Sequence, residues 1–223
     1  MKKQSFVAAF LAGTLVLSSC GLSNAVKGAG VGAVGGAAIG AGIGRVLGNT
    51  AVGAAIGGVV GGTAGTLIGK KMDKQKKQLE ESVKDAKIES INDGQAIRVT
   101  FDSGILFATG SASLSAASQA TLRKFAANLA EHSDTDLLIV GHTDNTGSDR
   151  VNNPLSYNRA ASVRTFLSSQ GVSTDRIKVE GKGSTEPVAD NSTVAGRRDN
   201  RRVEVYILPS KDMVKAAEAG TLK

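Results

Sequence analysis

Apolar residues in the second half of the chain recur with two different spacings, which predict strands and helices in turn. Ile97, Val99 and Phe101 alternate with polar residues, as in a strand with one buried face. Residues 137–140 form an uninterrupted apolar run, which is typical of a strand covered on both faces. Alternating apolar residues predict two further strands, at 177–179 and 203–207.

Two segments between these strands have the spacing of amphipathic helices. The first begins after Ser115, a residue type that commonly caps helices, and the second runs from Pro154 to a stop at Gly171. Their apolar faces are Leu122, Phe125, Ala126 and Leu129 in the first, and Leu155, Ala160, Val163, Phe166 and Leu167 in the second. The resulting order, β-α-β-α-β-β with two helices on one face of the sheet, predicts an α/β (α+β) sandwich over residues 94–210.

Before this domain the pattern changes to glycine at every fourth position. Glycine occupies positions 28, 32, 36, 40, 44 and 48, and then 53, 57, 61, 65 and 69. This spacing aligns small residues along one side of a helix and lets a second helix approach closely. We therefore predict that residues 28–69 form an antiparallel glycine-zipper hairpin in a membrane, with Arg45 near its turn. The alternative is a flexible Gly/Ala tether, because glycine lowers helix propensity by up to ~1 kcal/mol per residue in water.

The first residues have the pattern of a secretory signal that ends in a cysteine. Lys2 and Lys3 precede an apolar stretch over residues 6–17, and residues 17–20 read Leu-Ser-Ser-Cys. This resembles a bacterial lipobox, which implies that residues 1–19 are removed and that Cys20 is acylated at the start of a short segment, 20–27. The alternative is an uncleaved anchor with a chance cysteine.

Charged segments flank the predicted domain. Residues 70–93 combine many lysines and acids with Met72, Leu79 and Val83 at roughly heptad spacing, so we predict a charged linker helix. This helix would lie against lipid head groups or serve as a solvated spacer. Residues 211–223 are predicted to be a tail, either a peripheral helix or frayed.

The formal net charge of +7 is not spread evenly along the chain. Residues 91–223 contain 16 basic and 15 acidic residues, so the excess lies in the N-terminal third. The domain also lacks a basic stripe interleaved with aromatic residues, and we expect no nucleic-acid partner. One cysteine and two histidines offer no zinc cluster, so no metal and no cofactor are expected.

Candidate chemistry gathers in the loop and helix over residues 141–160. Arg159 lies within the apolar face of the second helix, where a guanidinium needs an anion because it cannot lose its proton. Asp144, in the loop before the helix, is the nearest candidate. The spacing alone allows a structural Asp–Arg pair that fixes the loop, and it also allows a pair that binds a ligand.

A series of short motifs follows in fixed order. They are Gly141-His142-Thr143-Asp144, Gly147, Asn152, Leu155-Ser156, Arg159-Ala160 and the Asn-Arg-Arg-Val-Glu of residues 200–204. Over residues 95–208 the chain resembles the OmpA-like peptidoglycan-binding domain family, whose Asp and Arg hold the diaminopimelate of the peptidoglycan stem peptide. The resemblance implies this role for Asp144 and Arg159, and a fold with helices packed on a mixed sheet.

Diaminopimelate suits these side chains because one of its carbons carries both an ammonium and a carboxylate. Asp144 can accept the ammonium, and Arg159 can grip the carboxylate with two parallel hydrogen bonds. We expect secondary contacts from Thr143, Asn145, Thr146 and Asn152, and a flanking cation from Arg201 or Arg202.

An enzymatic alternative would combine Ser156 and His142 with Asp144 or Asp149. The sequence has no nucleophile elbow, and no second carboxylate or metal cluster supports a hydrolytic site. We therefore predict that the protein is not an enzyme and that His142 is structural.

The chain as a whole resembles lipoproteins that combine a lipobox, a glycine zipper and this domain. It is expected to be lipid-anchored in the outer membrane, with its C-terminal domain in the periplasm, and to tether the membrane to peptidoglycan. Expected partners are peptidoglycan, outer-membrane lipid and, through the zipper, a second copy. The alternative is a membrane-active or envelope-assembly protein whose zipper is the working part and whose domain only localises it to the wall.

Overall fold

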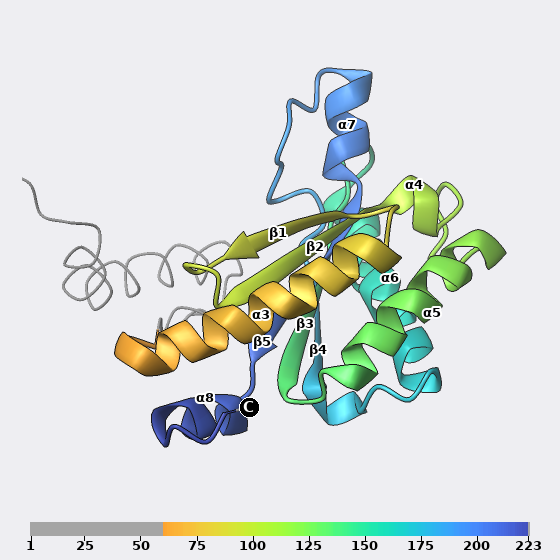
Figure 1. Cartoon of the computed structure of the whole chain (residues 1–223). Coiled ribbons are helices and arrows are strands. Elements are labelled where there is room, and N and C mark those ends of the chain that lie inside the picture. Colours follow the sequence, from red (N-terminus) through yellow and green to blue (C-terminus); the bar gives the residue numbers. More distant parts are fainter. Residues whose placement is uncertain (1–59, 223) are drawn as a thin grey trace, which may run out of the picture.

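The computed structural model describes residues 60–222 as a sheet packed with helices (Figure 1). The strands are β1 (Lys87–Ile91), β2 (Ala96–Asp102), β3 (Thr135–Gly141), β4 (Ile177–Gly181) and β5 (Arg202–Pro209). The helices are α3 (Gly62–Ser82), α4 (Ser103–Leu106), α5 (Ala116–Glu131), α6 (Asp149–Ser169), α7 (Val194–Asn200) and α8 (Lys211–Glu218), with a 3-10 turn at Thr174–Arg176.

The strands form one mixed sheet in the order β1-β2-β5-β3-β4. β3 and β4 are parallel because α6 crosses between them, whereas β5 lies antiparallel between β2 and β3. In this register Asp102, the last residue of β2, is opposite Arg202, and Gly141, the last residue of β3, is opposite Val203. The loops that follow β2 and β3 and the loop that precedes β5 therefore meet at one end of the sheet.

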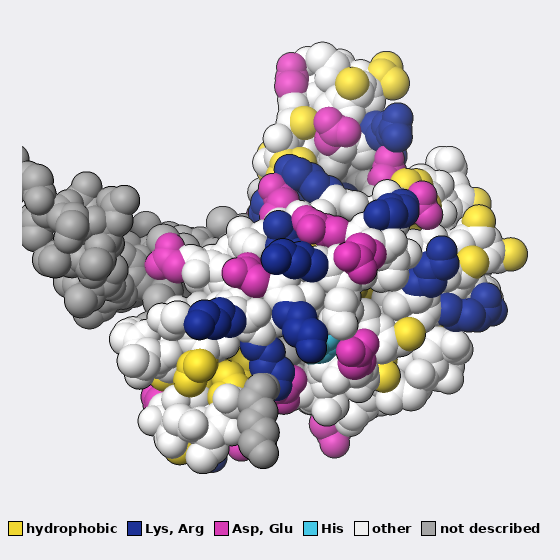
Figure 2. All heavy atoms as spheres, viewed as in Figure 1, with side chains coloured by type: hydrophobic (Ala, Val, Ile, Leu, Met, Phe, Trp, Pro, Cys, Tyr) yellow, Lys and Arg dark blue, Asp and Glu magenta, His cyan; other side chains and the backbone are white. Residues whose placement is uncertain are grey.

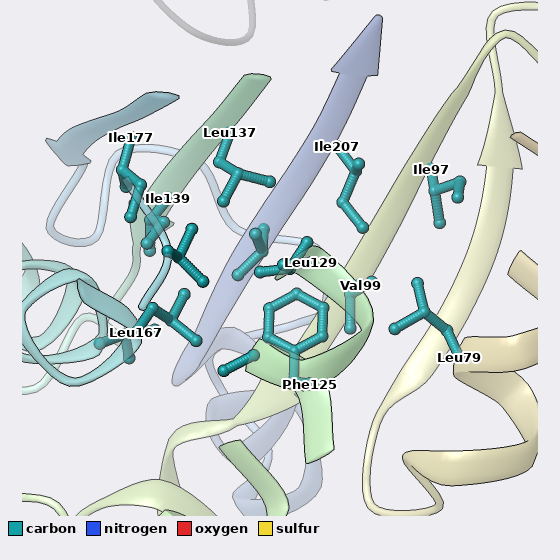
Figure 3. Close-up of a cluster of buried hydrophobic side chains, with 14 of the residues drawn as sticks. Leu79, Ile97, Val99, Phe125, Leu129, Leu137, Ile139, Leu167, Ile177 and Ile207 are labelled. Atoms are coloured by element: carbon teal, nitrogen blue, oxygen red, sulfur yellow. The ribbon is translucent and has the colours of Figure 1, made fainter. Parts of the chain in front are cut away.

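The main hydrophobic core lies between the sheet and the helices α3, α5 and α6 (Figure 3). Leu79 of α3, Phe125 of α5 and Leu167 of α6 point toward the inward-facing side chains of the strands. Phe101 of β2 packs edge to face on Phe125, with ring centroids 5.6 Å apart. The opposite sheet face has a smaller apolar cluster, made of Ala96, Leu138, Val140, Tyr206 and Leu208. The helices thus cover one side of the sheet, as a two-layer α/β arrangement requires.

The predicted β-α-β-α-β-β order is confirmed by β2, α5, β3, α6, β4 and β5. Ser115 caps α5 as predicted, because its hydroxyl accepts a hydrogen bond from the backbone N–H of Ser118 at 3.1 Å. α6 starts earlier than predicted, at Asp149, and Pro154 lies inside it. An acidic residue in the first turn stabilises the positive end of a helix, which favours this earlier start.

The prediction of a separate linker helix over residues 70–93 is wrong. α3 packs against α5 and α8, and the chain then forms β1, which pairs with β2. Met72 and Leu79 are buried in the main core, and Gln75 donates a hydrogen bond to Asn128 of α5 at 3.0 Å. The heptad-like spacing therefore reflects packing of the helix on the domain. Lysines on the other side of the helix gave the segment the composition of a solvated linker.

The last residues of the predicted zipper hairpin also belong to α3. Gly65 lies in this helix, and Ile68 is fully buried in the core of the domain. Within the described range, 60–222, no helix combines the length and the apolar character that a bilayer span needs. The signal peptide, Cys20 and zipper residues 28–59 lie outside the described residues.

α7 lies in a segment for which no element was predicted, and α8 lies in the predicted tail, in agreement with its helical alternative. α8 is capped by Ser210 and buries Met213 and Ala217, and it packs against α3. α7 stands away from the sheet just before β5 (Figure 1). Its position places the arginines of residues 197–202 near the end of the sheet where the loops meet.

Docking of α3 can be tested at Ile68. Ile68→Val removes one buried methyl group and is expected to lower the free energy of unfolding of the full chain by about 1 kcal/mol. Lys77→Ala, at an exposed position of the same helix, should change it by less than ~0.5 kcal/mol. Denaturant midpoints provide the measurement, and equal midpoints for all three proteins would show that α3 does not belong to the folded unit.

Candidate ligand-binding site

Two glycines allow α6 to lie directly on the ends of β3 and β4. A Cβ atom on Gly141 would lie 2.0 Å from the carbonyl oxygen of Ser156, and one on Gly181 would lie 2.5 Å from the backbone nitrogen of Tyr157. Both separations are far shorter than van der Waals contact, so only glycine fits at these positions. The contact places the part of α6 that carries Arg159 beside the loop that follows β3.

This loop is held by hydrogen bonds on both sides. Thr143 donates its backbone N–H to the carbonyl oxygen of Gly183 at 2.8 Å. The side-chain amide of Asn152 donates to the carbonyl oxygens of Asp144 and Thr146, at 3.3 and 3.1 Å. Oδ1 of Asp144 accepts the backbone N–H of Thr146 at 2.8 Å, which forms an Asx turn. The direction of the carboxylate is therefore fixed.

Asp144 pairs with Arg201 and not with Arg159. Its Oδ2 accepts a hydrogen bond from Nη1 of Arg201 at 2.5 Å. Burial raises the pKa of Asp144, but the Arg201 guanidinium and the hydrogen bond from Thr146 hold this pKa below its usual value. The carboxylate is therefore ionised at neutral pH. The structural Asp144–Arg159 pair that the spacing allowed is therefore not formed, because an arginine from the loop before β5 reaches the carboxylate instead.

Arg159 is only 4% exposed, as its place on the apolar helix face predicted. Its Nε donates to the carbonyl oxygen of Ser111 at 2.9 Å, and its Cζ lies 5.3 Å from the centre of the Phe107 ring. In the described part of the chain this guanidinium forms no salt bridge. Burial and the charge of Arg201 lower the pKa of Arg159, and the charge of Asp144 opposes them only in part.

Asp144 and Arg159 nevertheless line one pocket of about 500 Å³, at the end of the sheet where the loops meet. The other predicted residues that line it are Thr143, Thr146, Asn152 and Arg201. The sequence did not indicate Ser103, Gly104, Phe107 and Arg197, which line it as well. Most of these follow β2, which no periodicity of the sequence places beside the loop after β3. The cluster of arginines at residues 197–202 was the one available signal.

Two of the predicted secondary residues lie elsewhere. The backbone N–H of Asn145 donates to Oδ1 of Asn191 at 3.3 Å, and the residue is exposed. Arg202 is buried on the opposite sheet face, where its Nε contacts Oε1 of Glu204 at 2.7 Å. Neither residue lines the pocket of Asp144, so the structure does not bring these two together with the other predicted residues.

Arg202 instead lines a larger pocket, of about 740 Å³, between β1 and α7. Acidic and basic side chains lie next to one another over α3, β1 and the base of α7 (Figure 2). Most charges of this pocket are paired within the protein, since Arg98 contacts Glu89 at 2.8 Å, Arg198 contacts Asp102 and Arg202 contacts Glu204. Such paired charges leave no obvious ligand, so the smaller pocket is the better candidate.

The residues weighed as a catalytic triad are not assembled. The hydroxyl of Ser156 donates to the carbonyl oxygen of Asn153 and accepts the backbone N–H of Gly183, at 2.8 and 2.9 Å. His142 is buried on the other sheet face, and its Nε2 lies 3.7 Å from Oε2 of Glu204. That separation is too long for a hydrogen bond, and burial lowers the pKa of His142, so its ring is neutral.

Residues 106–201, which contain most of the pocket, match the OmpA family. These residues therefore form an OmpA-family domain. Residues 1–73 match a second family, the YMGG-like Gly-zipper. Both matches agree with the resemblances predicted from the motifs and from the glycine spacing.

Named relatives of the chain include two bacterial proteins. "Probable lipoprotein YiaD" of Escherichia coli (strain K12) is 36% identical over 62% of this chain and 63% of its own length. "Peptidoglycan-binding protein ArfA" of Mycobacterium tuberculosis (strain H37Rv) is 41% identical over 50% of this chain and 34% of its own length. The chain therefore spans less than two thirds of each of these relatives. A solved structure of the cell wall anchor of the T6SS from Pseudomonas aeruginosa is 32% identical, with a TM-score of 0.54, over 60% of this chain and 96% of that one.

Proposed function

We propose that the pocket binds the diaminopimelate of the peptidoglycan stem peptide, and that the protein thereby anchors a membrane to the cell wall. The observation that carries this proposal is the buried Arg159, which forms no salt bridge in the described part of the chain and lines the same pocket as the ionised Asp144. A buried cation of this kind is costly without an anion. A ligand carboxylate would supply it, with two parallel hydrogen bonds.

The free end of diaminopimelate matches both side chains at once. Its ammonium is attracted to Asp144 while the carboxylate on the same carbon reaches Arg159. The side chain of lysine, which replaces diaminopimelate in some peptidoglycans, ends in an ammonium alone and would leave Arg159 without a partner. We therefore expect the pocket to discriminate between the two by the carboxylate.

The printed names of the relatives support a role at the wall, since ArfA is called peptidoglycan-binding and the Pseudomonas structure a cell wall anchor. The first relative is called a lipoprotein. We infer that Cys20 is the acylated residue and that the protein sits in the outer membrane with residues 60–222 in the periplasm. In this role it acts as a tether and performs no catalysis.

The alternative function assigns the work to the glycine zipper, and the Gly-zipper family match favours it. In that case the domain only localises the zipper to the wall. A deletion that discriminates between the two must end before residue 60, because Gly65 and Ile68 belong to the fold of the domain. If envelope function is lost while wall binding persists, the zipper is the working part.

Binding of full-length protein to isolated sacculi tests the proposed site. Asp144→Asn and Arg159→Ala are each expected to weaken binding about tenfold or more, because a hydrogen bond to a charged group contributes roughly 1.5–3 kcal/mol. Free diaminopimelate should compete with the sacculi, and Nα-acetyl-lysine amide, which carries a side-chain ammonium but no carboxylate, should not. Pull-down at several sacculus concentrations gives the affinities.

Matched controls separate a lost ligand contact from a lost fold. Asp149→Asn and Arg150→Ala change the same residue types at exposed positions of α6 and should bind as the wild type does. The denaturant midpoint of each variant reports its stability. A folded Arg159→Ala protein that binds sacculi at wild-type strength would refute the proposed site.

A further inference from the structure

The pocket of Asp144 and Arg159 carries more positive than negative charge. Its ionisable lining residues are one carboxylate, Asp144, and three guanidinium groups, Arg159, Arg197 and Arg201. Three positive charges and one negative charge leave a net charge of +2. The free end of diaminopimelate, with one ammonium and one carboxylate, has no net charge. Its binding alone would leave the excess uncompensated.

The contacts of Asp144 increase the repulsion between positive charges in the pocket when a ligand ammonium binds. Oδ1 of Asp144 accepts the backbone N–H of Thr146, and Oδ2 accepts Nη1 of Arg201. A ligand ammonium must therefore share the carboxylate with Arg201 or displace that guanidinium. In either case Arg201 comes close to a second cation while it loses part of its counter-charge. An additional anion next to Arg201 would remove this repulsion.

Arg197 lies one helical turn before Arg201 and lines the same pocket. The backbone N–H of Arg201 donates to the carbonyl oxygen of Arg197 at 3.2 Å, and both side chains line the pocket. Nη1 of Arg197 donates to the carbonyl oxygens of Asn191 and Ser192, at 2.9 and 3.1 Å, which holds the side chain in place. In the part of the chain that the structure describes, Arg197 forms no salt bridge. Two held guanidinium groups thus lie together beside the proposed diaminopimelate contacts.

Two buried hydroxyl groups of the pocket also have no hydrogen-bond partner in the part of the chain that the structure describes. Ser103 and Thr143 are 2% and 5% exposed, and both line the pocket. Among residues 60–222, neither Oγ of Ser103 nor Oγ1 of Thr143 has a hydrogen-bond partner. Buried hydroxyls are normally hydrogen-bonded. These two are therefore available to further polar groups of a ligand, besides the ammonium and carboxylate of the free diaminopimelate end.

We propose that Arg197 and Arg201 form a second anion subsite, which binds another carboxylate of the same stem peptide. This inference rests on the proposed function and names its ligand more closely. The preferred ligand is a stem peptide with a net negative charge. It carries a second free carboxylate, in addition to the one at the free end of diaminopimelate. Amidation removes the charge of that group while it keeps the length of the peptide. The protein would then distinguish amidated from unamidated wall.

Synthetic tripeptides of the stem, L-Ala-γ-D-Glu-meso-diaminopimelate, test the subsite by titration calorimetry with full-length protein in detergent. One peptide has all carboxylates free, a second has the D-Glu carboxylate amidated, and a third has the C-terminal carboxylate amidated. The free end of diaminopimelate is unchanged in all three. Wild-type protein should lose about five- to tenfold in affinity on one of the two amidations. Arg197→Gln and Arg201→Gln should bind all three peptides equally weakly.

Arg198→Gln is the matched control, because Arg198 is the next residue of α7 but contacts Oδ2 of Asp102 at 2.8 Å and lines the other pocket. This variant should keep the wild-type preference for the unamidated peptide. Equal binding of all three peptides by wild-type protein would overturn the second subsite, as would an Arg197→Gln protein with the wild-type preference. If Asp144→Asn also binds every peptide as the wild type does, the proposed function itself fails, and the subsite fails with it.

Discussion

Replacing Gly141 with alanine is expected to lower the free energy of unfolding by about 3–5 kcal/mol, although it adds a single methyl group. The new Cβ would lie 2.0 Å from the carbonyl oxygen of Ser156 in α6. A clash with backbone cannot be relieved by a change of rotamer, so α6 must move away from β3. Arg159 moves with the helix, and binding to sacculi should weaken even though no contact residue has changed. Chemical denaturation and sacculus pull-down measure the two effects.

Gly69→Ala provides the matched control for this prediction. Gly69 lies in α3, and an added Cβ there would meet no atom within 4 Å. Alanine at such a helical position should leave stability unchanged or raise it by up to ~1 kcal/mol. If Gly141→Ala is as stable as Gly69→Ala, the close contact between α6 and β3 does not exist as described.

The sequence predicted those parts of the fold that depend on local periodicity. The alternation of Ile97, Val99 and Phe101 and the helical stripe around Phe125 each reflect one element with one buried face. α3 was misread because its buried face is narrow, and its lysines dominate the composition of the segment. Burial of Met72 and Leu79 depends on α5 and α8, which lie far away in the sequence. No local pattern contains that information.

The same distinction applies to the site. Asp144 and Arg159 could be singled out because one loop and one helix face carry them, and the family motifs support their role. The sequence did not show that Arg201 would take the carboxylate, since this pairing depends on β5 lying antiparallel beside β3. Ser103 and Arg197 reach the pocket through the same long-range arrangement. The order of the strands in the sheet therefore determines which distant residues reach the pocket, and the periodicity of the sequence does not predict this order.

A second large effect is expected at Glu204, on the uncovered face of the sheet. Its Oε1 accepts Nε of Arg202 at 2.7 Å, and its Oε2 accepts the hydroxyl of Tyr206 at 2.5 Å. Burial raises the pKa of Glu204, but the charge of Arg202 and the hydrogen bond from Tyr206 hold this pKa well below its usual range. Glu204→Gln leaves Arg202 buried without a counter-charge. We expect the free energy of unfolding at pH 7 to fall by about 3–5 kcal/mol.

Glu89→Gln is the matched control for Glu204→Gln, because Glu89 pairs with Arg98 on the same sheet face but both side chains are about one third exposed. Glu89→Gln should lower the free energy of unfolding by less than ~1 kcal/mol.

The folded-state pKa of Glu204 is lowered, so the pair stabilises the protein fully above the unfolded pKa of about 4.5 and progressively less as the pH falls below it. The stability difference between wild type and Glu204→Gln should therefore narrow at acidic pH. Arg202→Met, added to Glu204→Gln, should recover part of the loss, since it removes the unpaired cation. A stability difference that stays constant from pH 7 to pH 3 would contradict the ionised pair.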